Sequence, residues 1–399
     1  MSQTQSGHST LAVFGVLLFN FACYFNIGVP LAVLPAHVAH DMGLGSVMAG
    51  VVIGAQSLAT LLSRTLAGHL CDSRGSKYSV VWGLVALTGS GIAMSIATHA
   101  SSTATIIAWL LAGRAMLGVA ESLVTTGTMT WAIRMVEPSR AATAISWNGV
   151  TSYGGIALGA PAGAAACAYW GVDALGWLAW LPGLICLMLV RGKPAVAPLG
   201  GHGVPLSQVL LRVLPLGCGL ALATMGFGAV ASFISLRYLA AHWPHAALAL
   251  SVFGGCFVFV RVILASTISR FGGFHVARYA LPVEALGLAC VGFAPSPAVA
   301  LIGVAVAGAG FSLIFPALAI EVTKRLPESN RGTALGVFGL FFDLALGITG
   351  PVGGLLASQA GYPLVYYVVA ASALVATALV VALGRSASDT TAPTPSRRA

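Results

Sequence analysis

Long apolar runs follow one another along almost the whole chain, and only short polar stretches separate them. A bilayer core about 30 Å thick needs roughly 20 residues of α-helix to cross it, and each run has about that length or more. The runs predict twelve membrane-spanning helices, at approximately 11–34, 46–69, 78–98, 104–132, 141–166, 172–190, 209–236, 246–268, 275–294, 298–323, 332–358 and 362–384. An even number of crossings places both ends of the chain on one side of the membrane.

The stretch between the sixth and seventh runs divides the chain. Residues 191–207 are rich in Gly and Pro and have no periodicity, which is typical of a flexible linker. We therefore expect an N-terminal six-helix bundle over 1–190 and a C-terminal six-helix bundle over 208–385. The last segment, 386–399, is rich in Ser, Thr, Pro and Ala and is predicted to be a disordered tail.

An internal repeat supports the division into halves. The segment R-M-V-E-P-S-R at 134–140 recurs 191 positions later as R-L-P-E-S-N-R at 325–331. An arginine and a glycine also recur, 197 positions apart: Arg64 and Gly75 match Arg261 and Gly272. Repeats in the same order predict two similar, parallel halves.

The composition agrees with a membrane protein. Of the 399 residues 58% are hydrophobic and only 7% are charged, where soluble domains have about 25% charged residues. The net charge of +9 comes mostly from Lys and Arg between the runs, on the side expected to be cytoplasmic. The charge thus indicates orientation, with both termini in the cytoplasm, and does not indicate a nucleic-acid partner.

Candidate metal, cofactor and enzyme sites are absent from the sequence pattern. The seven cysteines have no paired spacing, and the nine histidines have no metal-ligand spacing. There is also no phosphate-binding glycine loop, and the loops are too short to assemble a catalytic triad. We expect no metal, no cofactor and no enzyme activity.

One short polar stretch carries a recognisable motif. Residues 68–77 read G-H-L-C-D-S-R-G-S-K and resemble the loop signature of the major facilitator superfamily, G-x-L-a-D-[RK]-x-G-[RK]-[RK]. Two serines, Ser73 and Ser76, stand at positions that are usually basic. The resemblance implies the major facilitator fold: an all-α integral membrane protein whose twelve transmembrane helices form two pseudo-symmetric six-helix bundles around a central cavity.

The same resemblance implies a cytoplasmic gate. The Asp72 carboxylate would lie near the start of the eleventh span and the basic end of the fourth, where the helix dipole and a salt bridge stabilise it. Ser269 replaces this aspartate in the second half. The residues assigned to the gate are Gly68, Asp72, Arg74, Gly75, Lys77 and Arg134.

Ionisable residues inside the spans are candidates for proton coupling, because embedding a charge is costly. Arg114 and Glu121 lie seven residues apart, on one face of the fourth span. The segment R-A-M-L-G from Arg114 resembles the family's R-x-x-x-G element, which is associated with proton coupling. Asp343 is a further candidate, and the alternative for all three is a static structural pair. For Glu284 and Glu321 we favour structural roles.

Two sets of small or polar residues complete the candidates. The fifth span resembles the antiporter motif G-x-x-x-G-P-x-x-G-G, with Ala160 inserted before the proline; its matching residues are Gly155, Gly159, Pro161 and Gly163. Close helix packing is the alternative interpretation. The predicted substrate-binding residues are Asn20, Tyr24 and Gln56, for which the alternative is hydrogen bonding between helices.

These observations predict a secondary active transporter in the bacterial inner membrane. Arg64, Arg261 and the segment V-E-A-L-G-L at 283–288 are similar to a twelve-helix branch described as drug- or sugar-efflux-like. We expect a monomeric, proton-coupled antiporter that exports a small organic molecule, with protons and the lipid bilayer as its other partners. The alternative is a symporter or facilitator that imports a sugar or organic acid. A scaffold without transport would not need embedded carboxylates.

Overall fold

The computed structural model describes residues 2–136, 141–196, 206–326 and 331–390, and these ranges contain helices and no strand. The helices are α1 (Ser2–Leu31), α2 (Leu34–Ala36), the π-helical turn η1 (His37–Asp41), α3 (Gly45–Ser73), α4 (Ser76–His99), α5 (Thr103–Met135), α6 (Ala141–Trp170), α7 (Ala174–Arg191), α8 (Leu206–Ala240), α9 (Ala247–Phe271), α10 (Gly273–Phe293), α11 (Pro297–Lys324), α12 (Arg331–Ala360) and α13 (Tyr362–Thr390).

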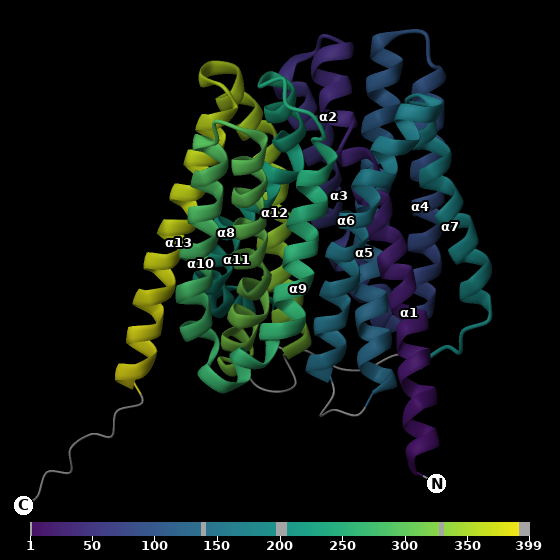
Figure 1. The fold of residues 1–399 in the computed structure, drawn as a ribbon. Helices are drawn as coiled ribbons and strands as arrows, with labels where there is room; N and C mark the ends of the chain where they lie inside the picture. Colours follow the sequence, from purple (N-terminus) through teal and green to yellow (C-terminus); the bar gives the residue numbers. More distant parts are fainter. Residues whose placement is uncertain (1, 137–140, 197–205, 327–330, 391–399) are drawn as a thin grey trace, which may run out of the picture.

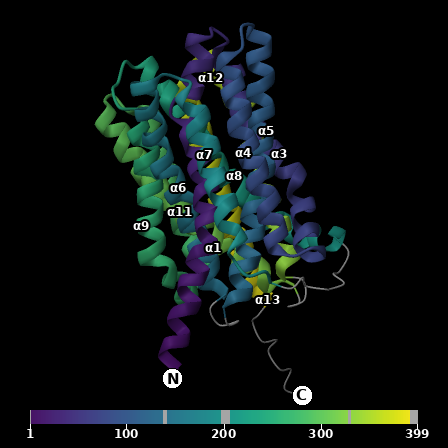
Figure 2. The same ribbon diagram turned by 90° about the vertical axis from the view of Figure 1, so that its right-hand side faces the viewer.

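The helices form two groups that stand side by side (Figure 1). Helices α1 to α7 lie in one group and α8 to α13 in the other, and most run roughly parallel or antiparallel to one another. Both views place the start of α1 and the end of α13 at the same end of the molecule (Figures 1 and 2). We call this end the terminal face and the other end the opposite face.

The predicted all-helical membrane fold is confirmed. Among the described residues eleven segments are long and apolar enough to cross a membrane, and the first of them continues from α1 through η1. Helix α6 is 30 residues long but is not one of the eleven; it carries the polar cluster Asn148, Thr151 and Ser152. With α6, the long helices match the twelve predicted spans in order.

Large apolar side chains cover the outside of the bundle. Leu62, Phe259, Leu286 and Phe293 are each at least 65% exposed. A soluble monomer rarely exposes so many contiguous apolar groups, whereas lipid chains solvate them. The protein is therefore a multi-pass membrane protein, and its backbone polar groups are satisfied within its helices.

The hairpin between α3 and α4 differs from the sequence interpretation. Helix α3 continues to Ser73, so most of the polar stretch is helical and Gly68 lies inside the helix. Only Gly75 has a positive φ, of 96° with ψ 157°. The helix continues because polar residues beyond the bilayer can still complete its hydrogen bonds, and a single glycine makes the turn.

The corresponding hairpin of the second half has the same geometry. Gly272, between α9 and α10, has φ 84° and ψ 156°. The repeat of Gly75 and Gly272 that was found in the sequence is thus a repeat of one backbone conformation, which residues with a Cβ atom rarely adopt.

The linker and the tail are only partly described. Helix α7 ends at Arg191 and α8 begins at Leu206; the Lys77 ammonium group donates hydrogen bonds to the carbonyl oxygens of Arg191 (3.2 Å) and Lys193 (2.6 Å). Residues 197–205 of the predicted linker lie outside the described residues. The predicted disordered tail begins too early, because α13 runs to Thr390; residues 391–399 lie outside the described residues.

Two interfaces join the groups of helices. At the first, α3 lies against α12 so closely that a Cβ atom on Gly50 would collide with the carbonyl oxygen of Gly350. At the second, α6 lies against α9, where a Cβ atom on Gly254 would be 2.7 Å from the carbonyl oxygen of Tyr153. These glycines allow the backbones to approach, which is the usual way for helices to pack tightly within a membrane.

Candidate functional site

A small cavity lies between the two groups of helices. Its walls come from α1, α3, α5 and α6 on one side and from α8 and α12 on the other. Its volume of about 40 Å³ is enough for one or a few water molecules. In this conformation the cavity is therefore too small for an organic substrate.

The two walls of the cavity differ in polarity. The charged and amide side chains, Gln56, Arg114 and Glu121, all come from the first half. The second half contributes Phe227, Phe342 and other apolar residues or glycine, and Ser232 is its one polar lining residue among those described. The chemistry of the cavity is thus concentrated on α3 and α5.

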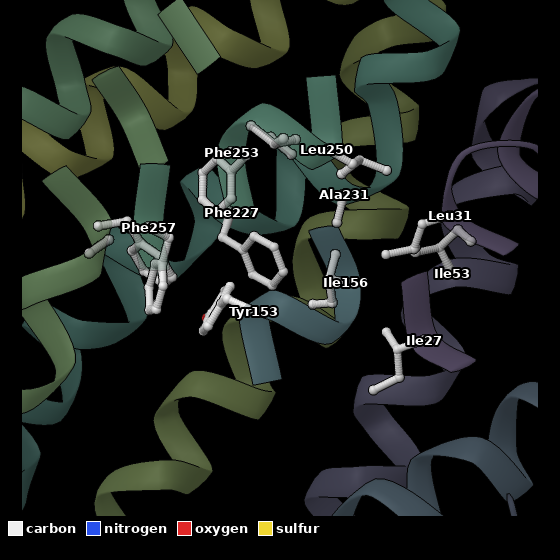
Figure 3. Packing of buried hydrophobic residues seen from close by; sticks show 14 of the residues in the cluster. Ile27, Leu31, Ile53, Tyr153, Ile156, Phe227, Ala231, Leu250, Phe253 and Phe257 are labelled. Carbon is white, nitrogen blue, oxygen red and sulfur yellow. The ribbon is translucent and has the colours of Figure 1, made fainter. Parts of the chain in front are cut away.

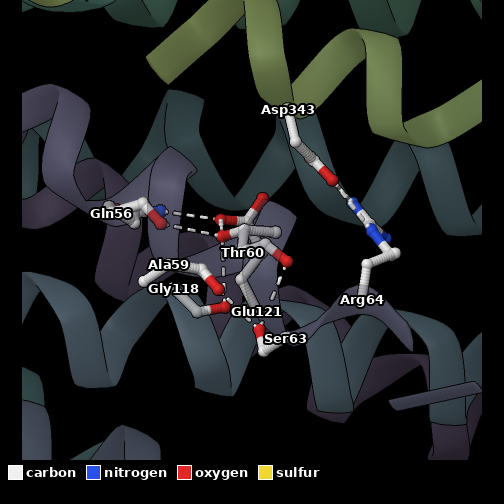
Figure 4. Close-up of polar contacts among 8 residues, drawn as sticks. All are labelled: Gln56, Ala59, Thr60, Ser63, Arg64, Gly118, Glu121 and Asp343. Carbon is white, nitrogen blue, oxygen red and sulfur yellow. Dashed lines mark hydrogen bonds and ion pairs between the residues drawn. The ribbon is translucent and has the colours of Figure 1, made fainter. Parts of the chain in front are cut away.

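Glu121 is held by donors from the neighbouring helix α3. Its Oε2 atom accepts hydrogen bonds from Gln56 Nε2 at 2.8 Å and Thr60 Oγ1 at 3.1 Å, and Figure 4 shows both side chains converging on it. The glutamate is 5% exposed. Helix α3 can approach α5 this closely because Gly118 has no Cβ atom, which would collide with the carbonyl oxygen of Gln56.

Arg114 also lines the cavity and lies seven residues before Glu121 on the same helix, α5. Its side chain is 2% exposed, and its Nη2 atom donates one long hydrogen bond, of 3.4 Å, to the carbonyl oxygen of Ile53. The Nε and Nη1 atoms are buried and have no hydrogen-bond partner within the described ranges. No ion pair joins Arg114 to Glu121 there, so both residues face the cavity separately.

Asp343 forms a buried ion pair with Arg64 across the α3–α12 interface. Arg64 Nη2 is 2.6 Å from Asp343 Oδ2, and the arginine donates hydrogen bonds of 2.9 Å from Nε and 2.8 Å from Nη2. Figure 4 shows the aspartate reaching down from α12 to the arginine of α3. The carboxylate side chain is 1% exposed. The pair links the two halves of the chain.

Aromatic rings surround the side of the cavity that is formed by α6 and α8. Tyr153 stacks on Phe257 with ring centroids 3.6 Å apart, and its edge meets Phe227 at 5.3 Å. Phe227 in turn stacks on Phe253 at 5.4 Å, and the four rings form one group in Figure 3. Tyr153 and Phe227 line the cavity, whereas Phe253 and Phe257 do not line it and pack against these two rings.

The predicted substrate-binding residues separate into two groups. Tyr24 and Gln56 line the cavity. Asn20 does not; its amide donates to Asn148 O at 3.1 Å and to Ser152 Oγ at 2.9 Å. Asn20 therefore joins α1 to α6, which is the alternative role considered for it.

The gate residues lie at the terminal face. Asp72 is exposed and forms no ion pair with any described residue. Arg74 lies over the ring of Tyr78, with 5.0 Å between its Cζ atom and the ring centroid. Arg134 is half-buried, and its Nη1 atom lacks a partner among the described residues. The expected contact of Asp72 with the start of α12 involves residues 331–333, whose side chains lie outside the described part of the structure, so this contact stays a prediction.

The motif glycines of α6 pack within the first half. Cβ atoms on Gly155, Gly159 and Gly163 would meet carbonyl oxygens of Phe21, Phe25 and Val29 on α1. Their spacing of four places them on one helix face, and Pro161 lies between them inside α6. The glycines of α12, by contrast, lie at the interface with the other half: Gly350 faces Gly50.

Two further embedded glutamates lie away from the cavity lining. Glu321 pairs with Lys324 at 2.8 Å, as favoured from the sequence, and also accepts a hydrogen bond of 2.9 Å from the backbone N–H of Gly273 at the start of α10. Glu284 is 1% exposed, and both its oxygens lack a partner among the described residues.

Sequence reasoning missed three features of the site. The sequence marks Arg64 as a repeated position and as part of the branch resemblance, but it does not identify Arg64 as the partner of Asp343. Tyr153 and Phe227 were not proposed as lining residues, because aromatic residues are frequent in every span. A signal for Tyr153 is its position between the polar residues Asn148 to Ser152 and the glycine-rich segment from Gly154, where a ring has few apolar neighbours in sequence.

Comparisons with known proteins agree with this architecture. The sequence profile of the Major Facilitator Superfamily matches residues 16–283 and 216–399. An uncharacterized MFS-type transporter of Pseudomonas aeruginosa (strain LESB58) is 45% identical over 377 residues, covering 94% of each chain. A second one, from Burkholderia mallei (strain SAVP1), is 43% identical over 376 residues, covering 94% of this chain and 92% of the relative.

Solved structures share the fold. The inward-open xylose transporter XylE from E. coli superimposes with a TM-score of 0.76 at 14% identity, covering 98% of this chain and 97% of the other. The matching profile, the relatives and the helical architecture lead to one conclusion: this chain belongs to the major facilitator superfamily and is a membrane transporter, not an enzyme.

Proposed function

We propose that the protein is a proton-coupled secondary active transporter that exports a small organic molecule by antiport across the bacterial inner membrane. The observation that carries this proposal is Glu121, a buried carboxylate that lines the central cavity between the two halves. A proton is the smallest cargo that such a group exchanges when its surroundings change from wet to dry. The protein works as a monomer with its terminal face in the cytoplasm.

The contacts of Glu121 support a role in proton exchange. Gln56 and Thr60 donate hydrogen bonds to the same carboxylate oxygen, and they hold the carboxyl group at the wall of the cavity. Opening the cavity to water on one side allows proton uptake, and opening it on the other side allows release. Substrate and proton thus bind in the same cavity at different stages of the transport cycle.

The two interfaces support alternating access. The glycine contacts Gly50–Gly350 and Gly54–Gly347 lie toward the opposite face, where they close the cavity in this conformation. Asp72 at the terminal face is free of an ion pair among the described residues. We propose that it reaches the start of α12 when the halves close at that face, an interaction of about 1–3 kcal/mol that biases the equilibrium between two conformations.

Import by proton symport is the second candidate, and one observation favours it. Arg114 and Glu121 face the same cavity without pairing, so a substrate and a proton have separate binding groups there. The antiporter-like glycines do not decide between the two directions, because contacts with α1 already account for them.

Flux in liposomes distinguishes the two directions. Purified protein is reconstituted with a trapped pH-sensitive dye, a pH gradient is imposed, and lipophilic cations, sugars and small acids are added one at a time. A compound that moves against the protons supports antiport, whereas one that enters with them supports symport. Movement of compounds without any proton flux would contradict proton coupling.

The role of Glu121 is tested with a matched pair of variants. Glu121→Gln keeps the size of the side chain and one acceptor oxygen for Gln56 and Thr60 but removes the exchangeable proton, so we expect loss of pH-driven flux by at least tenfold. Glu284→Gln removes an equally buried carboxylate that does not line the cavity, and flux should persist. Normal pH-driven flux in Glu121→Gln would reject the proposal.

A further inference from the structure

Arg114 is a buried cation with unused hydrogen-bond donors in the wall of the cavity. Its Nε and Nη1 atoms have no partner among the described residues, and Nη2 has only the 3.4 Å contact with Ile53. A guanidinium removed from water is costly unless its N–H groups are paired. The donors of Arg114 therefore form a site for a hydrogen-bond acceptor that the described part of the chain does not supply.

The embedded carboxylate on the same helix, Glu121, forms no ion pair with Arg114 among the described residues. Glu121 lies seven residues further along α5, about 10.5 Å along the helix axis, and its Oε2 atom is held by Gln56 and Thr60 from α3. Asp343 is bound to Arg64 across the α3–α12 interface. Neither carboxylate forms an ion pair with Arg114 in the described part of the chain.

The other residues that line the cavity indicate which kind of molecule would bind beside Arg114. Tyr24, Tyr153, Phe227 and Phe342 contribute rings to the cavity, and Ile27 and Leu346 contribute aliphatic groups. Such walls favour a flat apolar body through stacking and desolvation. A sugar would leave many of its hydroxyl groups against apolar side chains of the second half, which is unfavourable.

The charged groups in the cavity wall favour an anionic substrate over a cationic one. A cation would have to bind at Glu121, whose Oε2 atom already accepts two hydrogen bonds, and it would leave the donors of Arg114 unused within the described ranges. An anion would satisfy those donors, and a guanidinium forms strong charge-assisted hydrogen bonds with carboxylates.

We propose that the transported substrate is a small organic anion with an aromatic or otherwise flat apolar body, whose carboxylate binds Arg114. This assignment rests on the proposed transport function and specifies its substrate class. It is independent of direction, because either import or export can carry an anion. The cavity must enlarge to admit it, as the halves separate at one face.

Binding of three matched probes tests the proposal without transport. We would titrate detergent-purified protein with 3-phenylpropionate, its neutral amide 3-phenylpropanamide and the cation 2-phenylethylammonium, and follow the heat of binding. The wild-type protein should bind the propionate at least tenfold more tightly than the other two. Equal binding of all three, tighter binding of the ammonium, or no binding of any probe would overturn the proposal.

Variants of Arg114 locate the preference. Arg114→Gln should abolish the tenfold preference for the anion, and Arg114→Lys should retain part of it because the charge remains. Arg261→Gln is the matched control, since Arg261 is 5% exposed and does not line the cavity; the preference should persist there. Size-exclusion profiles establish that each variant is folded, and an anion preference that survives in Arg114→Gln would overturn the assignment.

The liposome assay separates this proposal from the transport function. If only 2-phenylethylammonium or the neutral amide moves with a proton flux that Glu121→Gln abolishes, the anion assignment fails and proton coupling stands. If 3-phenylpropionate binds through Arg114 but its flux is indifferent to the pH gradient and to Glu121→Gln, the substrate class stands and proton coupling fails.

Discussion

The two interfaces between the halves occupy equivalent places in the repeat but use different chemistry. Arg64 of α3 and Arg261 of α9 are matching positions. Arg64 meets the carboxylate of Asp343 across its interface. Arg261 meets no carboxylate in the described ranges; its Cζ atom lies 4.8 Å from the ring centroid of Phe257, and its Nε atom is 3.5 Å from Ser312 Oγ.

The reason for the difference can be located in one residue. The offset of 191 that relates 134–140 to 325–331 places Ser152 of α6 where α12 has Asp343. The Ser152 hydroxyl donates to Asn148 O at 2.9 Å and accepts from Asn20. The repeat thus preserves the helix positions, while one side-chain difference makes one interface ionic and the other aromatic.

The largest expected effect is at the ionic interface. Asp343→Asn leaves the partly buried Arg64 without its counter-charge, so we expect the free energy of unfolding to fall by about 3 kcal/mol, the lower end of the cost of breaking a buried pair. Thermal unfolding in detergent measures the loss. In the double variant Arg64→Met with Asp343→Leu most of the stability should return, because no buried charge remains; equal loss in both would show that the pair contributes no coupling.

Backbone contact at the same interface gives a smaller effect. Gly50→Ala places a Cβ atom against the carbonyl oxygen of Gly350, and the two backbones must separate to admit it. We expect a loss of about 1–3 kcal/mol and greater exposure of the cavity toward the opposite face, measured by labelling of an introduced cysteine. Gly336→Ala is the control, because no atom lies within 4 Å of its Cβ position; a similar loss there would contradict the explanation by contact.

The smallest effect comes from making the two interfaces alike. A Cβ atom on Gly149 would lie 3.5 Å from Arg261 Nη1, and Ser152 is one turn further along the same helix face. Ser152→Asp should therefore form a second ion pair and slow transport by about tenfold, equivalent to about 1.4 kcal/mol. Initial rates of flux measure this, and adding Arg261→Gln should restore the rate. Ser152→Asn slowing transport equally would point to steric disruption.

Much of the fold could be predicted from local patterns. In lipid each backbone group must find its hydrogen bond within its own helix, so long apolar runs predict helices and their order without knowledge of the neighbours. The predicted helix ends are too early where the helices leave the lipid: α3 continues to Ser73, and α13 continues to Thr390. The embedded residues Arg114 and Glu121 could be identified because an ionisable group in an apolar run stands out, and helical periodicity places them on one face.

Local sequence is thus enough to define the series of helices, the repeat and the identity of the embedded charges. How these residues combine depends on the packing of the helices. Asp343 pairs with Arg64, 279 residues away in sequence, and Asn20 bonds to α6. Two donor atoms of Arg114, beside the ring-lined cavity, have no partner among the described residues. The physical reason is that a helix forms through contacts four residues apart, whereas the partner of a buried polar group depends on which helix faces meet, and small residues such as Gly50 and Gly350 set that contact across the whole chain.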